Sequence, residues 1–168
     1  SSGMGSMSSL AAEMLKSESK TNIVHVPYKG TLPALTDVIS GQIDMMLADF
    51  ALIKSHADSG RLRVLGVTGS KRSAAAPSVP TIAESGLPGY ELSPWFGVVA
   101  PAGVPKDLVT KLNGVIGSSL KSQDVVQRLG ALGYEPLGGT PEQFAATIKA
   151  DIVKYAKIVK AAGIQPRL

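Results

Sequence analysis

The first nine residues of the chain read Ser-Ser-Gly-Met-Gly-Ser-Met-Ser-Ser and lead into a predicted helix. The backbone N–H groups and the positive dipole at a helix start, together with several hydroxyls, suit the binding of an anion. A flexible terminus or a cloning remnant accounts for the same composition. The glycine spacing of these residues approximates the dinucleotide-binding fingerprint, but the segment lacks the preceding strand and the third glycine. The residues of this candidate anion site are Ser2, Gly3, Gly5, Ser6 and Ser8.

A second candidate for anion binding is the turn Tyr28-Lys29-Gly30-Thr31, which follows a predicted strand and opens a predicted helix. Asp49 follows the next predicted strand and can accept a hydrogen bond from a ligand. Ligands of open α/β sheets collect outside the carboxyl ends of the strands, so we expect both segments at one rim. The alternatives are an ordinary strand–helix turn for the first segment and a helix cap for Asp49.

The two histidines, His25 and His56, are the candidates for acid–base chemistry. Neither has a serine and an acidic residue at a spacing typical of a hydrolase triad, and the chain has no Gly-x-Ser-x-Gly motif. No histidine pair or acidic cluster has the spacing of metal ligands, and the chain has no cysteine. The sequence therefore predicts neither a metal site nor a catalytic thiol, and it gives no sign of a cofactor.

These candidate residues need elements to position them, and the first half of the chain alternates between strand and helix patterns. Apolar residues spaced by three and four predict a helix at residues 6–18. The short connections that follow favour right-handed βαβ crossovers and a parallel sheet. The expected elements are strands at 22–27, 43–48 and 61–68, and helices at 31–40 and 50–59.

Composition changes after Thr68, where residues 69–94 are rich in proline and glycine and form a predicted linker. Within it, Thr81 and Glu84 have the spacing of a capping box, which predicts one helical turn. A second capping box, with proline at the first helical position, begins a last helix at Thr140. The other expected elements are strands at 95–100 and 134–137 and helices at 104–120 and 122–131.

The composition of the 168 residues is that of a folded globular protein, with 44% hydrophobic and 18% charged residues. The net charge of +4 and the pI of about 9.4 suit an anionic small molecule. Because the basic residues are scattered and not interleaved with aromatic ones, we expect no nucleic acid partner. No apolar run is long enough to span a membrane. The chain starts without methionine, so we expect an upstream part to be missing.

A series of collinear motifs gives the chain a family resemblance. They include Ser1-Ser-Gly-x-Gly-Ser, Val26-Pro-Tyr-Lys-Gly, Gly41-Gln-x-Asp-Met-Met, Leu65-Gly-Val-Thr-Gly-Ser-Lys-Arg-Ser, Pro77-Ser-Val-Pro-Thr-Ile-Ala-Glu-Ser-Gly, Ala100-Pro-Ala-Gly-Val-Pro and Gly138-Gly-Thr-Pro-Glu-Gln-Phe. Over essentially its whole length the chain resembles the Bug/TctC family, the periplasmic solute-binding components of tripartite tricarboxylate transporters.

The resemblance implies an α/β fold of the periplasmic-binding-protein type II (Venus flytrap) kind, in which two lobes close on a ligand. Residues 1–90 would form the second ligand-binding lobe, built of βαβ units. Residues 91–168 would be the returning, mostly helical C-terminal portion of the first lobe. The N-terminal half of the family chain, with its signal peptide, would be missing. We therefore expect exposed apolar helix faces that pack against that missing half or a second copy of the chain.

The resemblance also implies a non-enzymatic, periplasmic protein that captures a small carboxylate and delivers it to the membrane components of the transporter. Family ligands are di- and tricarboxylates, acidic amino acids and aromatic acids. By position, the serine–glycine loop and residues 28–31 would contribute to the carboxylate site, with Asp49 on the matching third loop. This chain has Ser9 where many relatives have histidine, so no contact is carried over to that position. The alternative function is that of an α/β enzyme acting on a small anionic substrate.

Overall fold

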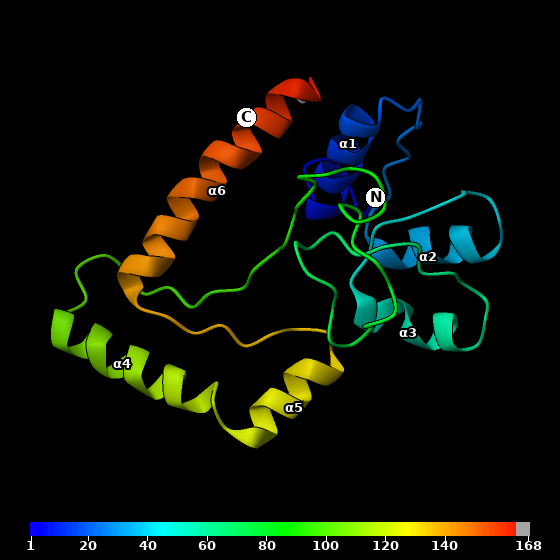
Figure 1. Ribbon diagram of the computed structural model, residues 1–168. Helices are drawn as coiled ribbons and strands as arrows, with labels where there is room; N and C mark the ends of the chain where they lie inside the picture. Colours follow the sequence, from blue (N-terminus) through cyan, green and yellow to red (C-terminus); the bar gives the residue numbers. More distant parts are fainter. Residues whose placement is uncertain (164–168) are drawn as a thin grey trace.

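Six helices account for the regular structure of residues 1–163, the part of the chain that this computed structural model describes. All six coincide with helices expected from the sequence, within two residues at nearly every end (Figure 1). The helices are α1 (Met7–Ser19), α2 (Thr31–Ile39), α3 (Phe50–Asp58), α4 (Lys106–Ser119), α5 (Gln123–Ala131) and α6 (Pro141–Ala161).

Local hydrogen bonds explain where several of these elements begin. The Ser6 side chain accepts a hydrogen bond from the Ser9 N–H and so caps α1. At α6, Thr140 and Gln143 form the predicted capping box, with proline in the first turn. The capping box of the predicted turn at residues 81–85 is also confirmed, because Thr81 N–H donates to Glu84 Oε2 (2.8 Å) and Glu84 N–H donates to Thr81 Oγ1 (3.0 Å).

The five expected strands do not form as hydrogen-bonded strands within residues 1–163, so that part of the secondary-structure prediction is wrong. Segments 22–27, 43–48 and 61–68 connect the helices, but their backbones donate no hydrogen bonds to one another in this part of the chain. An apolar, β-branched sequence favours an extended backbone, whereas a strand also needs a partner at hydrogen-bonding distance.

Two short stretches nevertheless pair in parallel. Val67 and Thr81 form an isolated parallel bridge. At the start of the chain, the Ser1 amino group donates to Val26 O (2.9 Å) and Tyr28 N–H donates to Ser1 O (3.0 Å). A residue that donates to one neighbour of the facing residue and accepts from its other neighbour makes the parallel pattern. Ser1 therefore runs beside residues 26–28 in the direction expected of a parallel sheet.

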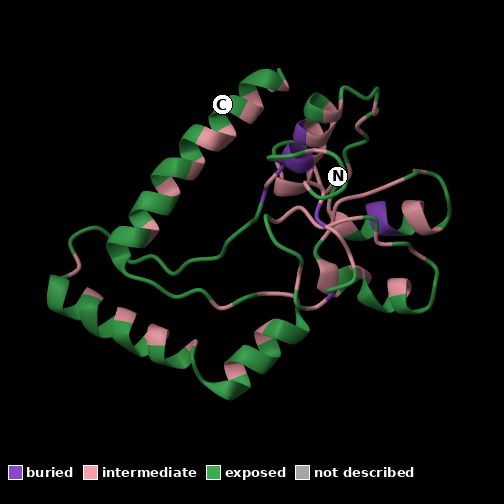
Figure 2. Cartoon of the chain, viewed as in Figure 1, coloured by how far each residue is buried: buried purple, intermediate pink, exposed green. Residues whose placement is uncertain are grey.

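The buried core of the described residues lies between positions 9 and 92 (Figure 2). Its main cluster joins α1 to the end of the predicted linker, and its members are Leu10, Ala11, Met14, Tyr90 and Leu92. The hydroxyl of Tyr90, which is 1% exposed, donates to the Ala11 carbonyl (2.8 Å) and so satisfies a buried helical carbonyl. The linker thus contributes two residues to this cluster, although its composition predicted only a connection.

Residues beyond 92 are far more open. Helices α4 and α5 lie apart from α1–α3, and both are largely exposed (Figures 1 and 2). Helix α6 returns to α1, where Tyr155, Ile158 and Val159 pack against the core cluster. Near its middle, the indole N–H of Trp95 donates to Asp151 Oδ2 (2.6 Å). None of the described helices is long and apolar enough to cross a membrane.

Candidate functional site

The serine loop, defined here as residues 1–8, is held together by its own hydroxyls. Ser8 Oγ accepts from the Ser2 N–H (3.0 Å) and lies 2.9 Å from Ser2 Oγ and 3.0 Å from Ser6 Oγ. Ser6 Oγ donates to the Gly3 carbonyl (2.7 Å). Ser9 is buried and donates to the Ser6 carbonyl, which fixes the first turn of α1. The loop is therefore a built structure at the N-terminus of α1.

Gly3 is needed for its conformation and for the space around it. Its φ is +137°, in the region that favours glycine, and an added Cβ would lie 3.3 Å from the carbonyl oxygen of Tyr28. Gly5 also has a positive φ, +76°, but with open space around it. The close approach at Gly3 allows the loop to lie directly against residues 28–30.

The serine loop and the predicted turn at residues 28–31 are adjacent. Gly30 N–H donates to Ser2 O (3.1 Å), which adds to the bond from Tyr28 N–H to Ser1 O. Ser2 therefore bridges the turn on one side and Ser8 on the other. Two helix starts face this region, because α1 begins at Met7 and α2 begins at Thr31. The structure thus brings together nine of the ten residues that the sequence singled out.

The first turns of both helices keep unpaired backbone donors. Within residues 1–163, the N–H groups of Met7, Ser8, Thr31 and Leu32 donate no hydrogen bond. Gly30, the N-cap of α2, has no side chain to satisfy them. These unpaired N–H groups, together with the positive ends of two helix dipoles, create a local preference for negative charge.

The side chains of the 28–31 turn differ in their roles. Tyr28 turns its hydroxyl away from the loop and donates to Asp37 Oδ2 on α2 (2.7 Å), and this hydrogen bond raises the pKa of Tyr28. Lys29 is exposed, while Gly30 and Thr31 are partly buried. The turn therefore offers backbone groups to the site, with Lys29 as its one free charge.

Asp49 stands apart from the rest of the candidate site. It occupies the N-cap position of α3 and is exposed, but its carboxylate makes no capping hydrogen bond. In the described residues no contact joins it to the serine loop or to the 28–31 turn; its charge acts instead on Tyr134, whose pKa is raised first by burial and then by Asp49. Of the three segments expected at one rim, only the serine loop and the 28–31 turn are in contact.

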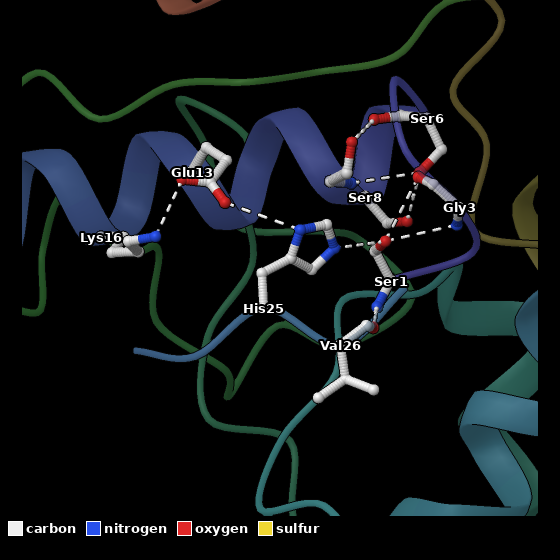
Figure 3. A network of polar contacts seen from close by, with 9 residues as sticks. Ser1, Gly3, Ser6, Ser8, Glu13, Lys16, His25 and Val26 are labelled. Carbon is white, nitrogen blue, oxygen red and sulfur yellow. Dashed lines mark hydrogen bonds and ion pairs between the residues drawn. The ribbon is translucent and has the colours of Figure 1, made fainter. Parts of the chain in front are cut away.

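One group of contacts was not foreseen from the sequence. His25 Nε2 lies 2.6 Å from Ser1 Oγ, and His25 Nδ1 lies 3.6 Å from Glu13 Oε1 on α1 (Figure 3). Burial lowers the pKa of His25. Because these residues come from three segments, no fixed spacing in the sequence marks them. No group of three or more potential metal ligands occurs among residues 1–163.

Comparison with known proteins decides the family. The sequence model of the tripartite tricarboxylate transporter family receptor, TctC, matches residues 1–164. The chain belongs to the TctC family. A curated TctC-like relative, the UPF0065 protein of the tcbD–tcbE intergenic region of a Pseudomonas species, is 38% identical over 95% of the chain and 48% of its own length. The BugT protein of Bordetella pertussis is 35% identical over 95% of the chain and 49% of its own length. The chain therefore spans about half the length of these two relatives.

Solved structures show the same fold for this TctC-family chain. Rpa4515 of R. palustris with adipate has a TM-score of 0.87 and 37% identity, over 99% of this chain and 56% of that one. The periplasmic binding protein BugD has a TM-score of 0.81 and 33% identity, over 98% of this chain and 56% of that one. MatC of Rhodopseudomonas palustris, with bound malate, has a TM-score of 0.74 and 33% identity, over 94% and 54%. The expected periplasmic-binding-protein fold is thereby confirmed.

Proposed function

We propose that the chain is part of a periplasmic receptor that captures a small dicarboxylate for a tripartite tricarboxylate transporter. The observation that carries this proposal is the family match over residues 1–164, joined to two similar structures solved with adipate and with malate. The ligand's negative charge fits the net charge of +4 and the two helix starts at the serine loop.

The proposed site binds a carboxylate with Ser2, Gly3, Gly5, Ser6 and Ser8 on one side and Tyr28, Lys29, Gly30 and Thr31 on the other, while Asp49 contacts the remainder of the ligand. Most of these groups are neutral N–H and O–H donors. Neutral donors hold a carboxylate by hydrogen bonds without the bidentate ion pair that an arginine would form, which favours release to the membrane partner. Closure of a second lobe over this wall would complete the site.

Two arrangements of the chain are proposed together with this function. Residues 1–90 form one ligand-binding lobe and residues 91–168 belong to the other; apart from Leu92, the buried residues of the described part of the chain all fall in the first range. The exposed apolar side chains of the second part would be covered by residues equivalent to the other half of the longer relatives, or by a second copy of the chain.

The test is calorimetric titration of the protein with adipate, malate and hexanoate. Adipate and malate carry two carboxylates and hexanoate carries one, so we expect both dicarboxylates to bind and hexanoate to bind more weakly. Ser8→Ala removes a hydroxyl at the centre of the loop and should weaken dicarboxylate binding about two- to tenfold. Ser118→Ala, which removes an exposed hydroxyl on α4, is the matched control. Equal effects of the two variants would contradict the proposed site.

A second candidate is an α/β enzyme acting on a small anion, and the contact of Ser1, His25 and Glu13 favours it. A serine hydroxyl at a histidine that faces a carboxylate is the arrangement of a hydrolase nucleophile. The discriminating measurement is the hydrolysis of p-nitrophenyl acetate by the wild-type protein and by His25→Gln. Turnover that disappears in the variant supports the enzyme, whereas dicarboxylate binding without turnover supports the receptor.

A further inference from the structure

The contacts of His25 connect the serine loop to the middle of α1. The imidazole lies between Ser1 Oγ, at 2.6 Å from Nε2, and Glu13 Oε1, at 3.6 Å from Nδ1 (Figure 3). The other oxygen of Glu13 lies 3.2 Å from Lys16 Nζ. The side chains of His25 and Glu13 are each 13% exposed. The carboxylate and the imidazole are thus largely removed from water on the flank of α1.

The surroundings of the imidazole select one arrangement of its proton. A carboxylate faces Nδ1, so the neutral ring carries its hydrogen there, and Nε2 is left as an acceptor. Ser1 Oγ–H then donates to Nε2 at 2.6 Å in preference to the Gly3 carbonyl, which lies 3.2 Å from the same oxygen. The lone pairs of Ser1 Oγ remain free to accept from the Gly3 N–H at 3.3 Å. Two hydrogen bonds thus run in one direction, from Gly3 through Ser1 to His25, and the Glu13 carboxylate faces the far side of the ring at 3.6 Å.

This direction matters because Gly3 lies at the centre of the loop. Its carbonyl accepts from both the N–H (3.2 Å) and the Oγ–H (2.7 Å) of Ser6, which caps α1. The glycine conformation also tolerates no side chain, as shown above. Ser1 and Ser6 therefore fix Gly3 from its two sides, and His25 is what fixes the side chain of Ser1.

We propose that His25, oriented by Glu13, is a positioning residue that holds the serine loop in its ligand-binding geometry through Ser1 Oγ. This inference rests on the proposed function, since the loop is taken to bind a carboxylate. His25 itself contacts no ligand in this arrangement. Its role is to pre-order the donors of the loop before the ligand arrives, which lowers the entropy lost on binding.

The first experiment compares His25→Gln with His25→Leu by calorimetric titration with adipate and malate. A glutamine amide can accept from Ser1 Oγ near the position of Nε2, whereas leucine cannot. We expect His25→Leu to weaken binding about two- to tenfold and His25→Gln to retain most of the wild-type affinity. His56→Leu changes the chain's other histidine, on α3, and is the control that should leave the affinity unchanged.

A pH profile gives a readout that a purely structural role would not move. Protonation places a hydrogen on Nε2 and turns the Ser1 hydroxyl away from the ring, so wild-type affinity should fall as the pH is lowered past the pKa of His25, which burial holds below the ordinary histidine value. Protonation of the ligand carboxylates weakens binding to both proteins alike, so the affinity of His25→Gln should fall less than that of the wild type over the same range. The charged groups that act on His25 are Glu13, Lys16 and the Ser1 amino group.

Amide hydrogen exchange at Gly3 tests the inference without any ligand. We expect faster exchange of the Gly3 N–H in His25→Leu, and wild-type exchange in His25→Gln and His56→Leu. Unchanged exchange and unchanged affinity in His25→Leu would overturn the positioning role, and so would faster exchange with wild-type affinity. If the wild-type protein binds neither dicarboxylate, the proposed function fails, and the exchange rates alone decide the role of His25.

Discussion

Gly3 is the residue whose replacement the serine loop tolerates least. Its φ of +137° and the Tyr28 carbonyl 3.3 Å from an added Cβ mean that Gly3→Ala strains both the backbone and the contact with residues 28–30. We expect the free energy of unfolding to fall by about 1–3 kcal/mol, measured by urea denaturation.

The control for this change is Gly114→Ala, a glycine-to-alanine substitution in the interior of α4. Nothing lies within 4 Å of the added Cβ at Gly114. Alanine is favoured over glycine in a helix by roughly 1 kcal/mol, so this variant should be stabilised. Destabilisation of the same size in both variants would show that Gly3 has no special conformational role.

Tyr90 should make the protein sensitive to alkali. Burial, with a smaller effect of Glu18, raises the pKa of Tyr90 from 10.0 to about 12. Below pH 10 the phenol is neutral in both states. Between pH 10 and 12 only the unfolded chain loses the proton, so the free energy of unfolding falls by about 1.4 kcal/mol per pH unit.

Urea denaturation at pH 8, 9, 10 and 11 measures this dependence. Lysines and the other tyrosines titrate in the same range, so the comparison is with Tyr90→Phe, which retains them. The variant should be less stable at pH 8, because the Ala11 carbonyl loses its donor, but its stability should fall less steeply above pH 10. Parallel curves for the two proteins would contradict the prediction.

Contacts of single residues could be predicted from the sequence when the partners are close along the chain, and not when they are far apart. The hydroxyls and glycines of residues 1–8 are contiguous, so their gathering at a helix start was foreseeable. Tyr28 lies just before α2, as expected, although the strand predicted ahead of it does not form, and its hydroxyl reaches Asp37, nine residues away. The contact of His25 with Ser1 and Glu13 joins three segments through the folded backbone, and no spacing rule describes it.

Helix α6 offers a direct measurement of what one cap contributes. Thr140→Ala removes the hydroxyl that accepts the Gln143 N–H and breaks the capping box. We expect a loss of about 1 kcal/mol in the free energy of unfolding, measured by urea denaturation. Ser122→Ala at the N-cap of α5 is the matched control, because Ser122 makes no side-chain capping bond. A larger loss at Ser122 would refute this explanation of the caps.

Helices and strands were not equally predictable. The helices could be located because apolar spacing and caps are local signals, and the hydrogen bonds of a helix close within four residues. The strand segments carried the right residue types, but a strand is completed only by a neighbour. Among the described residues such neighbours are present at Ser1 beside residues 26–28 and at Val67 beside Thr81, with one further bond from Leu92 N–H to Thr68 O (2.9 Å).

The molecule as a whole should associate through its second half. Large apolar side chains are exposed there, among them Phe96 and Val99 at 80% each and Ile152 at 63%. We expect the purified 168-residue chain to form dimers or larger species with rising concentration, measured by sedimentation velocity and native mass spectrometry.

Ile152→Lys should lower this self-association, whereas Lys149→Ala, on the same helix, should not. A monomer at all concentrations with cooperative unfolding would show that these side chains need no cover. Exposure of this kind was expected from the family resemblance, which places most of the lobe that would cover these helices in the other half of the family chain.

Because α6 packs on α1, the last helix of the chain also supports the serine loop at the start of α1. Helix α1 has the serine loop at its N-terminus and α6 along its flank, and the Glu13 that orients His25 lies on this same helix. A chain that ends before Pro141 would expose Leu15 and its neighbours on α1. Helix α1 would then hold the serine loop, with its N–H and O–H donors, less firmly. Proteolysis at the C-terminal end would then weaken the proposed binding site without cutting any of its residues.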